Sequence, residues 1–263
     1  MPELPEVETV VRSVRSHVTG KTILAVSLSS RRVTRADHEE TIKALTGATI
    51  TGVRRRGKQI LIDLHHGLLY VHLGMTGKLL WNATPTKYTR AQLQFEDGLL
   101  LYDDTRMFGR VEFFADPPEM LTRVGPDALT VSFEDFYARL KRHKGRIKAV
   151  LLNQAFLAGV GNIYADESLF AAGIHPKAAA SRVSKTRAQK LHTHLLEILE
   201  TAIQHRGSSI SDYVDSAGER GGYQQLHNVY GRTGENCLRC GASIRRIVLA
   251  QRGTHFCPRC QRP

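Results

Sequence analysis

Residues 1–12 read MPELPEVETVVR, and this stretch decides how the N-terminal part of the chain folds. Valine recurs at positions 7, 10, 11, 14 and 18, which is the spacing of one face of a helix. Pro5 suits the first helical turn, and the acids Glu3 and Glu6 favour the positive end of the helix dipole. The stretch therefore predicts an amphipathic helix from Pro5 to about His17.

The same residues also allow chemistry. If Met1 is removed, Pro2 becomes the N-terminus, and its secondary amine can attack a carbon such as a sugar C1′. An α-amino group titrates near pH ~7.7–8.0, so a useful fraction is uncharged at neutral pH. Glu3 lies beside it as a candidate acid. Taken alone, the stretch is better explained as a helix start, so the case for chemistry depends on the rest of the chain.

The charge balance indicates a polyanionic partner. The 263 residues contain 37 Lys and Arg against 25 Asp and Glu, a formal net charge of +12. Nucleic acid is the first candidate for such a chain, and an acidic membrane surface is the second. No apolar run approaches the roughly 20 residues that span a bilayer, and the N-terminus lacks the pattern of a signal peptide. We therefore expect a cytosolic protein.

Four cysteines near the C-terminus have the spacing of a zinc site. They form the pattern C-x2-C-x16-C-x2-C with Cys237, Cys240, Cys257 and Cys260. Two such knuckles bring four thiolates around one tetrahedral Zn²⁺, whereas two disulfides would require an oxidising compartment. Residues 230–263 also carry seven Arg and one acid, a local formal charge of 7 − 1 = +6. The spacing predicts one structural zinc in a cationic hairpin, which suits DNA or a protein partner.

Turn residues and hydrophobic periodicity divide the chain into three parts. Strands are predicted at 49–51, 60–64, 68–73, 91–95 and 99–102, which indicates a β-sandwich. After a Pro-rich linker the pattern becomes helical, with a capping box at Ser132 and helices near 147–157, 162–172 and 185–205. Residues 207–225 are predicted to form a loop. We expect an α+β fold with domains at 1–124, 125–228 and 229–263.

Three further motifs carry candidate functional residues. The turn Arg54-Arg55-Arg56-Gly57-Lys58 concentrates four cations, either as a phosphate-binding hairpin tip or as an ordinary solvated turn. Met75 lies between glycines in the segment 72–77, and Arg106 and Phe108 lie in the segment 106–109. Proteins that evert a base fill the gap in the stack with such side chains, although core packing explains each residue separately. The turn at Gly159–Gly161 precedes a helix and suits a phosphate.

Together these motifs resemble one family. The segments MPELPEVETVVR, RRRGKQILIDL, HLGMTGKL, LYDDTRMFGR, AGVGNIYADESLFAAGIHP, SDYVDSAGERGGYQQ and the two cysteine segments are similar to the Fpg/Nei family of DNA glycosylases. The similarity extends from residue 1 to residue 262, and Leu4 resembles the Fpg branch. It implies a bifunctional DNA glycosylase and AP lyase that removes oxidised purines from duplex DNA by a Schiff base and β,δ-elimination. The alternatives are the same chemistry on oxidised pyrimidines, or a non-catalytic zinc protein that binds DNA.

The resemblance also assigns roles to residues of this chain. It makes Pro2 the nucleophile, Glu3 the general acid, Lys58 the proton donor of β-elimination, and Arg252 that of δ-elimination or a phosphate clamp. Void-filling side chains would be Met75, Arg106 and Phe108, and backbone contacts would come from His72, Lys144, Lys148 and Asn162. Residues 207–225 would recognise the lesion. It further implies a monomer that acts on the bacterial nucleoid, with structural Zn²⁺ as the one cofactor.

Some positions depart from the family pattern. Met107 replaces the usual second cation after Arg106, and the segment 87–90, ending in Arg90, replaces a histidine-containing DNA contact. The loop has Gly221 where proline is common. The lysine before the helical hairpin falls at His143 or Lys144. These departures concern the choice of lesion more than the chemistry.

Overall fold

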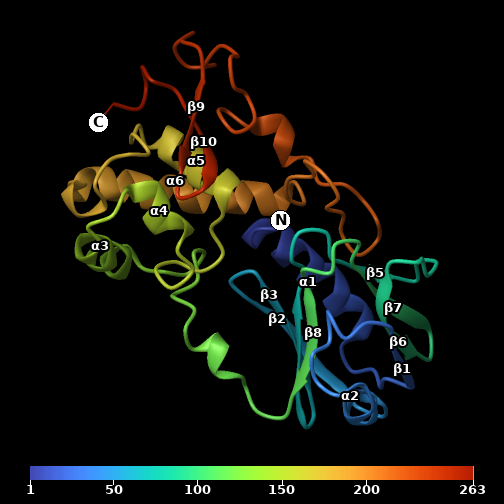
Figure 1. Cartoon of the computed structure of the whole chain (residues 1–263). Coiled ribbons are helices and arrows are strands. Elements are labelled where there is room, and N and C mark those ends of the chain that lie inside the picture. Colours follow the sequence, from blue (N-terminus) through green and yellow to red (C-terminus); the bar gives the residue numbers. More distant parts are fainter. Residues whose placement is uncertain (263) are drawn as a thin grey trace. The chain divides into compact units, whose positions relative to one another are not determined.

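The computed structural model describes residues 1–262, and their contacts form two compact units (Figure 1). The first unit contains Met1–Thr122 and His205–Gln224. The second contains Arg123–Gln204 and the chain from Gln225 onward. Mixed helix and sheet confirm the α+β class. The division into domains at 124/125 and 228/229 stays a prediction.

The first helix confirms the valine spacing. Helix α1 spans Leu4–Val18, and all five valines of its sequence are buried. Pro5 lies in the first turn, and the side chain of Glu6 accepts a hydrogen bond from the backbone N–H of Glu3 at 2.7 Å. This capping-box contact supplies a partner for an N-terminal amide that has none within the helix.

Two antiparallel four-stranded sheets form the predicted sandwich. One has the order β1-β6-β7-β5 and the other β2-β3-β4-β8. The strands of the first sheet are β1 Ala25–Leu28, β5 Lys78–Trp81, β6 Thr89–Phe95 and β7 Gly98–Asp103. Those of the second are β2 Ile50–Arg56, β3 Gln59–Leu64, β4 Gly67–His72 and β8 Arg110–Phe114. All five predicted strands are present, whereas β1, β5, β8 and helix α2 (His38–Leu45) were not predicted, since they are short and flanked by polar residues.

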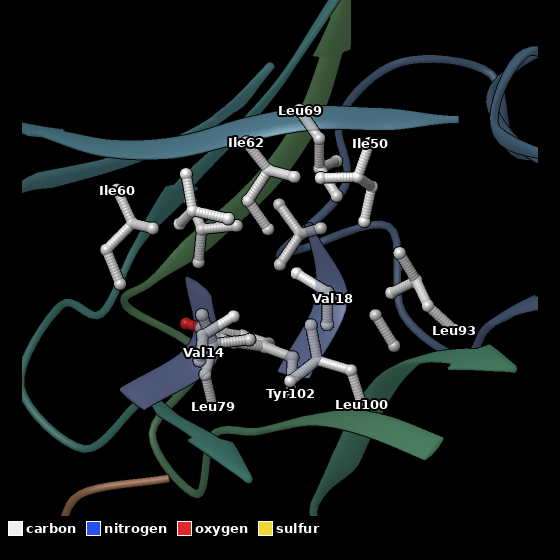
Figure 2. Close-up of a cluster of buried hydrophobic side chains, with 14 of the residues drawn as sticks. Val14, Val18, Ile50, Ile60, Ile62, Leu69, Leu79, Leu93, Leu100 and Tyr102 are labelled. Atoms are coloured by element: carbon white, nitrogen blue, oxygen red, sulfur yellow. The ribbon is translucent and has the colours of Figure 1, made fainter. Parts of the chain in front are cut away.

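The core of this unit lies between the sheets. Alternate residues of facing strands, such as Ile62 and Leu69 on one sheet and Leu100 and Tyr102 on the other, point into it (Figure 2). Val14 of α1 joins the same cluster. Burial of these side chains holds the sheets and α1 as one body, with the strand-end loops at its rim.

The second unit is helical and ends in a hairpin. Its helices are α3 Phe133–Arg142, α4 Ile147–Leu152, α5 Asn162–Ala171 and α6 Lys185–Gln204. The Ser132 hydroxyl caps α3 as predicted. The prediction of a helix over 147–157 was wrong at its end, because Asn153 has extended backbone and residues 153–157 form turns. Short 3-10 turns occur at η1 Glu119–Leu121, η2 Ala180–Arg182 and η3 Tyr223–Leu226.

Strands β9 Arg245–Leu249 and β10 Arg252–Phe256 pair as a hairpin beside the cysteines. Its two-residue tip has positive φ at Ala250 and Gln251, 49° and 58°. That is the geometry of a type I′ turn, which Asn and Gly adopt far more readily. No helix in residues 1–262 combines the length and apolar character that crossing a bilayer requires.

Candidate active site and metal centre

The N-terminal residues are enclosed by the protein. Pro2 is buried and Glu3 is only 3% exposed, whereas Met1 is 50% exposed. With Met1 in place, the Pro2 nitrogen is an amide and has no free lone pair for nucleophilic attack. Removal of Met1 would make the Pro2 nitrogen a secondary amine, one residue before Glu3 in the chain.

Glu6 joins the start of α1 to the predicted recognition loop. Its Oε1 accepts a hydrogen bond from the backbone N–H of Ser208 at 2.8 Å. Gly207 has a φ of +79°, and a Cβ there would lie 2.6 Å from Glu6 Oε1. The Tyr213 hydroxyl donates to the Glu6 carbonyl at 3.2 Å, and burial, then the Glu6 charge, raise the pKa of Tyr213. The loop is therefore anchored to the helix that carries Pro2 and Glu3.

Ser209 holds the two ends of this loop together. Its backbone N–H donates to Gln224 Oε1 at 2.9 Å, and its hydroxyl accepts from the Gly221 N–H at 2.8 Å. Arg220 donates to the Ser209 carbonyl at 2.8 Å. A Cβ on Gly221 would lie 2.2 Å from the Gly207 carbonyl oxygen, so this close approach requires glycine. The unusual Gly221 is thus explained by contact within the loop.

The basic turn presents fewer available cations than its sequence suggests. Arg54 forms an ion pair with Asp63 at 2.8 Å, and Arg55, with a side chain 7% exposed, pairs with Glu8 at 2.9 Å. Burial acts to raise the pKa of Glu8, but hydrogen bonds from Arg12 and Arg55 outweigh it and the pKa is lowered. Arg54 and Arg55 therefore tie the strands and α1 together, and phosphate binding by this turn stays a prediction. Lys58 is half-buried at the turn.

His72 lies within the electrostatic reach of Lys58. Burial lowers the pKa of His72, and the positive charges of Lys58 and Arg110 lower it further. Its Nδ1 accepts a hydrogen bond from the Gly74 N–H at 3.1 Å. A neutral ring with an accepting Nδ1 carries its proton on Nε2. His72 is thus a neutral donor next to a lysine.

The three candidate void-filling residues come from two loops of the first unit. Met75 is 41% exposed and Phe108 is 58% exposed, so neither is core packing. The Arg106 guanidinium carbon lies 4.7 Å from the centre of the Phe108 ring, a cation–π contact. Met107, by contrast, packs against the core and has a left-handed φ of 54°. The variant residue therefore faces inward, next to the Ser30 hydroxyl.

Within the second unit, the two candidate lysines differ. Lys144 is exposed in the turn before α4, whereas His143 is half-buried against Phe156, which favours Lys144 as the surface cation. Lys148 is fully buried, and its ammonium donates to Asp166 and to the Asn162 carbonyl. The prediction that Lys148 contacts DNA was wrong, because its charge is neutralised inside the unit.

Asn162 and Arg252 lie on adjoining elements. The Asn162 side chain donates to the Gly253 carbonyl at 2.9 Å, next to the exposed Arg252 at the start of β10. Asp166, one turn along α5, accepts hydrogen bonds from His255, its N–H at 2.9 Å and its Nδ1 at 3.2 Å. Helix α5 and the hairpin are therefore held in register.

Two buried acids that organise this unit were not predicted from the sequence. Asp166 and Glu167 are 1% exposed, and Glu167 accepts hydrogen bonds from the backbone of Asn228, Val229 and Tyr230 at 2.8–2.9 Å. The sequence did contain a signal of their burial, since two acids follow one another in an otherwise apolar helix. Buried carboxylates require partners, so hydrogen-bond donors could have been expected near them. Most of the partners could not be inferred, because apart from Lys148 they lie about 60 to 90 residues away.

The four cysteines converge as their spacing predicts. Their Sγ atoms all lie within 4.8 Å of one another, with Cys237–Cys260 at 3.9 Å and Cys240–Cys257 at 3.5 Å. Zn–S bonds of about 2.3 Å in a tetrahedron place sulfurs about 3.8 Å apart. A backbone hydrogen bond from Ala242 lowers the pKa of Cys240 to about 7, whereas burial and the other thiols raise that of Cys260 to about 12. A divalent cation would relieve this conflict, so the set fits one structural zinc.

Comparison with known proteins agrees with this arrangement. Three family models match: the formamidopyrimidine-DNA glycosylase N-terminal domain over residues 1–111, its H2TH domain over 124–214, and the zinc finger found in FPG and IleRS over 234–263. The chain belongs to the formamidopyrimidine-DNA glycosylase family. The formamidopyrimidine-DNA glycosylase of Solibacter usitatus is 50% identical over 100% of both chains.

Solved structures of this family share the fold. A mutant Fpg of Lactococcus lactis, in complex with Fapy-dG containing DNA, has a TM-score of 0.92 at 38% identity and covers 100% of both chains. A MutM in complex with DNA containing carbocyclic 8-oxo-G has a TM-score of 0.91 at 38% identity, again over 100% of both chains.

Proposed function

We propose that this chain is a DNA glycosylase and AP lyase that excises oxidised purines from duplex DNA in base excision repair. Its substrates would be 8-oxoguanine and formamidopyrimidines. The observation that carries the proposal is full-length similarity to enzymes bound to such lesions, together with Pro2 and Glu3 beside an anchored loop. The net charge of +12 supports a DNA partner, and a place on the bacterial nucleoid in the cytoplasm follows as part of the proposal.

The proposed chemistry begins at the N-terminus. After Met1 is removed, the Pro2 amine forms a bond to C1′ as the glycosidic bond breaks, and Glu3 supplies the proton to the opening sugar. The base leaves, and an iminium links Pro2 to the deoxyribose. β-Elimination then breaks the C3′–O bond and δ-elimination the C5′–O bond. Lys58 is the proton donor of the β-elimination, and Arg252 is the proton donor of the δ-elimination or clamps a phosphate.

The remaining residues would hold and open the duplex. Met75, Arg106 and Phe108 are exposed and suit the gap left by an everted nucleotide, where stacking is worth about 1–3 kcal/mol per base. His72 as a neutral donor and Lys144 as an exposed cation would contact the phosphates, and Asn162 would do so from the N-terminus of α5. Zinc, when bound by the four cysteines, supplies rigidity to the hairpin that presents Arg252.

A panel of duplexes with single lesions tests the proposal. Each duplex carries 8-oxoguanine, a formamidopyrimidine, an oxidised pyrimidine or an abasic site, and single-turnover excision is measured with protein lacking Met1. We expect the two purine lesions to be excised fastest and the abasic site to be cut with β,δ products. Faster excision of the pyrimidine would move the chain to the Nei-like alternative. Tight binding without any cleavage would make it a non-catalytic binder.

A further inference from the structure

Asp104 is a completely buried carboxylate at the base of the two loops that carry Met75, Arg106 and Phe108. It directly follows β7 and has 0% exposure. Its Oδ1 accepts hydrogen bonds from the Thr76 hydroxyl at 2.6 Å and the Arg106 N–H at 3.2 Å. Its Oδ2 accepts from the Gly109 N–H at 2.8 Å. One carboxylate therefore contacts the Met75 loop and both ends of the Arg106–Phe108 loop.

Thr76 closes this junction. Its hydroxyl donates to Asp104 and accepts from the Arg106 N–H at 3.1 Å. The backbone of Asp104 is itself held, because its N–H donates to the Tyr88 carbonyl at 3.0 Å and its carbonyl accepts from Arg90 at 3.1 Å. The variant Arg90 thus contributes to the support of Asp104.

The two loops also pack without spare room. A Cβ on Gly74 would lie 2.6 Å from the Gly109 nitrogen, and a Cβ on Gly109 would lie 1.7 Å from the Tyr102 hydroxyl. That hydroxyl lies 3.2 Å from the His72 carbonyl and 3.4 Å from Asp104 Oδ2, so it can donate to either. Burial, then the charge of Asp104, raise the pKa of Tyr102 and keep it a donor. A shift of one loop therefore moves the other.

We propose that Asp104 is a positioning residue that makes Met75, Arg106 and Phe108 enter the duplex as one rigid wedge. The inference rests on the proposed function, and deepens it by naming what holds the wedge. Asp104 is fully buried and does not touch DNA. Its effect passes through the loops, since exposed Met75 and Phe108 depend on their backbone anchors for position.

The variant Asp104→Asn tests this inference. Each carboxylate oxygen already accepts from a donor, so the new amide NH₂ faces an N–H or O–H whichever way it turns. The matched control is Asp103→Asn. The Asp103 carboxylate accepts from Thr86 at 2.9 Å and Thr89 at 2.6 Å. It lies one residue away in sequence and is not bonded to either wedge loop in these contacts.

We expect Asp104→Asn to slow excision of 8-oxoguanine paired with cytosine roughly 10- to 100-fold, because a misplacement of the wedge side chains by about 1 Å can lower the rate by that factor. Cleavage of a pre-formed abasic site, where less base is displaced, should change less than about 3-fold. Asp103→Asn should leave both rates within about 2-fold. 2-Aminopurine beside the lesion should show slower unstacking with Asp104→Asn alone.

A mutant cycle separates positioning from general stability. In a Met75→Ala, Phe108→Ala background the wedge is absent, so adding Asp104→Asn should lower the excision rate by less than about 3-fold. The inference would be overturned if Asp104→Asn lowered the rates on both DNA substrates equally. It would also be overturned if Asp104→Asn lowered the excision rate as much in the background without the wedge as in the unaltered protein. If Asp104→Asn does not fold, Thr76→Val is used instead, because it removes only the hydroxyl contacts. Thr76→Val should slow lesion excision more than abasic-site cleavage, and Thr76→Ser should restore the excision rate. Equal losses on the two substrates with Thr76→Val would also overturn the inference. Absence of excision by the unaltered protein would instead reject the proposed function.

Discussion

The carboxylate of Glu6 accepts a hydrogen bond from the backbone N–H of Ser208, 202 residues further along the chain, at 2.8 Å. The other oxygen of the same carboxylate accepts from the Glu3 N–H at 2.7 Å. One side chain therefore connects the proposed general acid to the proposed recognition loop. Through the Glu6 carboxylate, the conformation of the loop at residues 207–225 is coupled to the position of the Glu3 backbone.

Glu6→Gln should loosen the loop. The amide cannot accept from both N–H groups, and an unsatisfied buried donor costs about 1–3 kcal/mol. Amide hydrogen exchange at Ser208 should accelerate by roughly 5- to 150-fold, measured by mass spectrometry. Glu8→Gln is the control, because Glu8 lies on the same helix but pairs with Arg12 and Arg55. Unchanged exchange at Ser208 would remove this anchoring role.

Pro2→Gly should weaken covalent trapping. Borohydride reduces an iminium, so the unaltered protein without Met1 should form a stable adduct with abasic DNA, located on the N-terminal peptide by mass spectrometry. Protein that keeps Met1 should form no adduct at Pro2, because the Pro2 nitrogen is then an amide. An adduct on an internal lysine would overturn the assignment of Pro2.

Glu3→Gln should separate the two activities. Base excision needs the acid most, and loss of general acid catalysis costs roughly 10²–10⁴-fold, whereas cleavage of a pre-formed abasic site should persist. Single-turnover assays on the two DNA substrates measure the ratio. Equal losses on both would count against Glu3 as the acid of the glycosidic step.

Cys237→Ser should release zinc and abolish DNA binding while the first unit stays folded. A structural zinc site contributes directly to the folding of its hairpin, so metal content and thermal unfolding report the change. Leu238→Ala is the control, since Leu238 is 73% exposed and is not one of the four thiols. Native protein that binds and cuts DNA after complete zinc removal would refute the structural role.

The salt dependence of DNA binding should distinguish Lys144 from His72. Lys144→Ala should shallow the slope of log affinity against log salt by about one unit, because one counterion fewer is released. The pKa of His72 lies below 6.5, so at about pH 7.5 the ring is neutral. His72→Gln should therefore weaken binding with an unchanged slope at that pH, and protonation should add to the slope only as pH falls through the lowered pKa. A one-unit change for His72→Gln at about pH 7.5 would contradict the neutral donor.

Several features followed from local sequence patterns alone. The valine spacing predicted α1, alternation predicted the strands around Ile60 and Leu93, and the cysteine spacing predicted a four-thiol cluster. Such patterns are informative because helix period, strand period and knuckle geometry depend on neighbours within a few residues. The sequence also drew attention to Met75 between glycines, but it left core packing open for Met75 and Phe108, and the structure shows both to be exposed.

The pairing of charges was decided by tertiary structure. Lys148 was expected to contact the DNA backbone, yet Asp166 of the next helix neutralises it in the interior. Arg55 was expected in a phosphate-binding or solvated turn, and its ion pair with Glu8 of α1 was not predicted. Asp104 and Glu6 each have one distant donor, Thr76 and Ser208 respectively, which only folding brings near. A charged residue carries no local signal of its partner, because electrostatic and hydrogen-bond energies depend on distance and burial rather than on position in the chain.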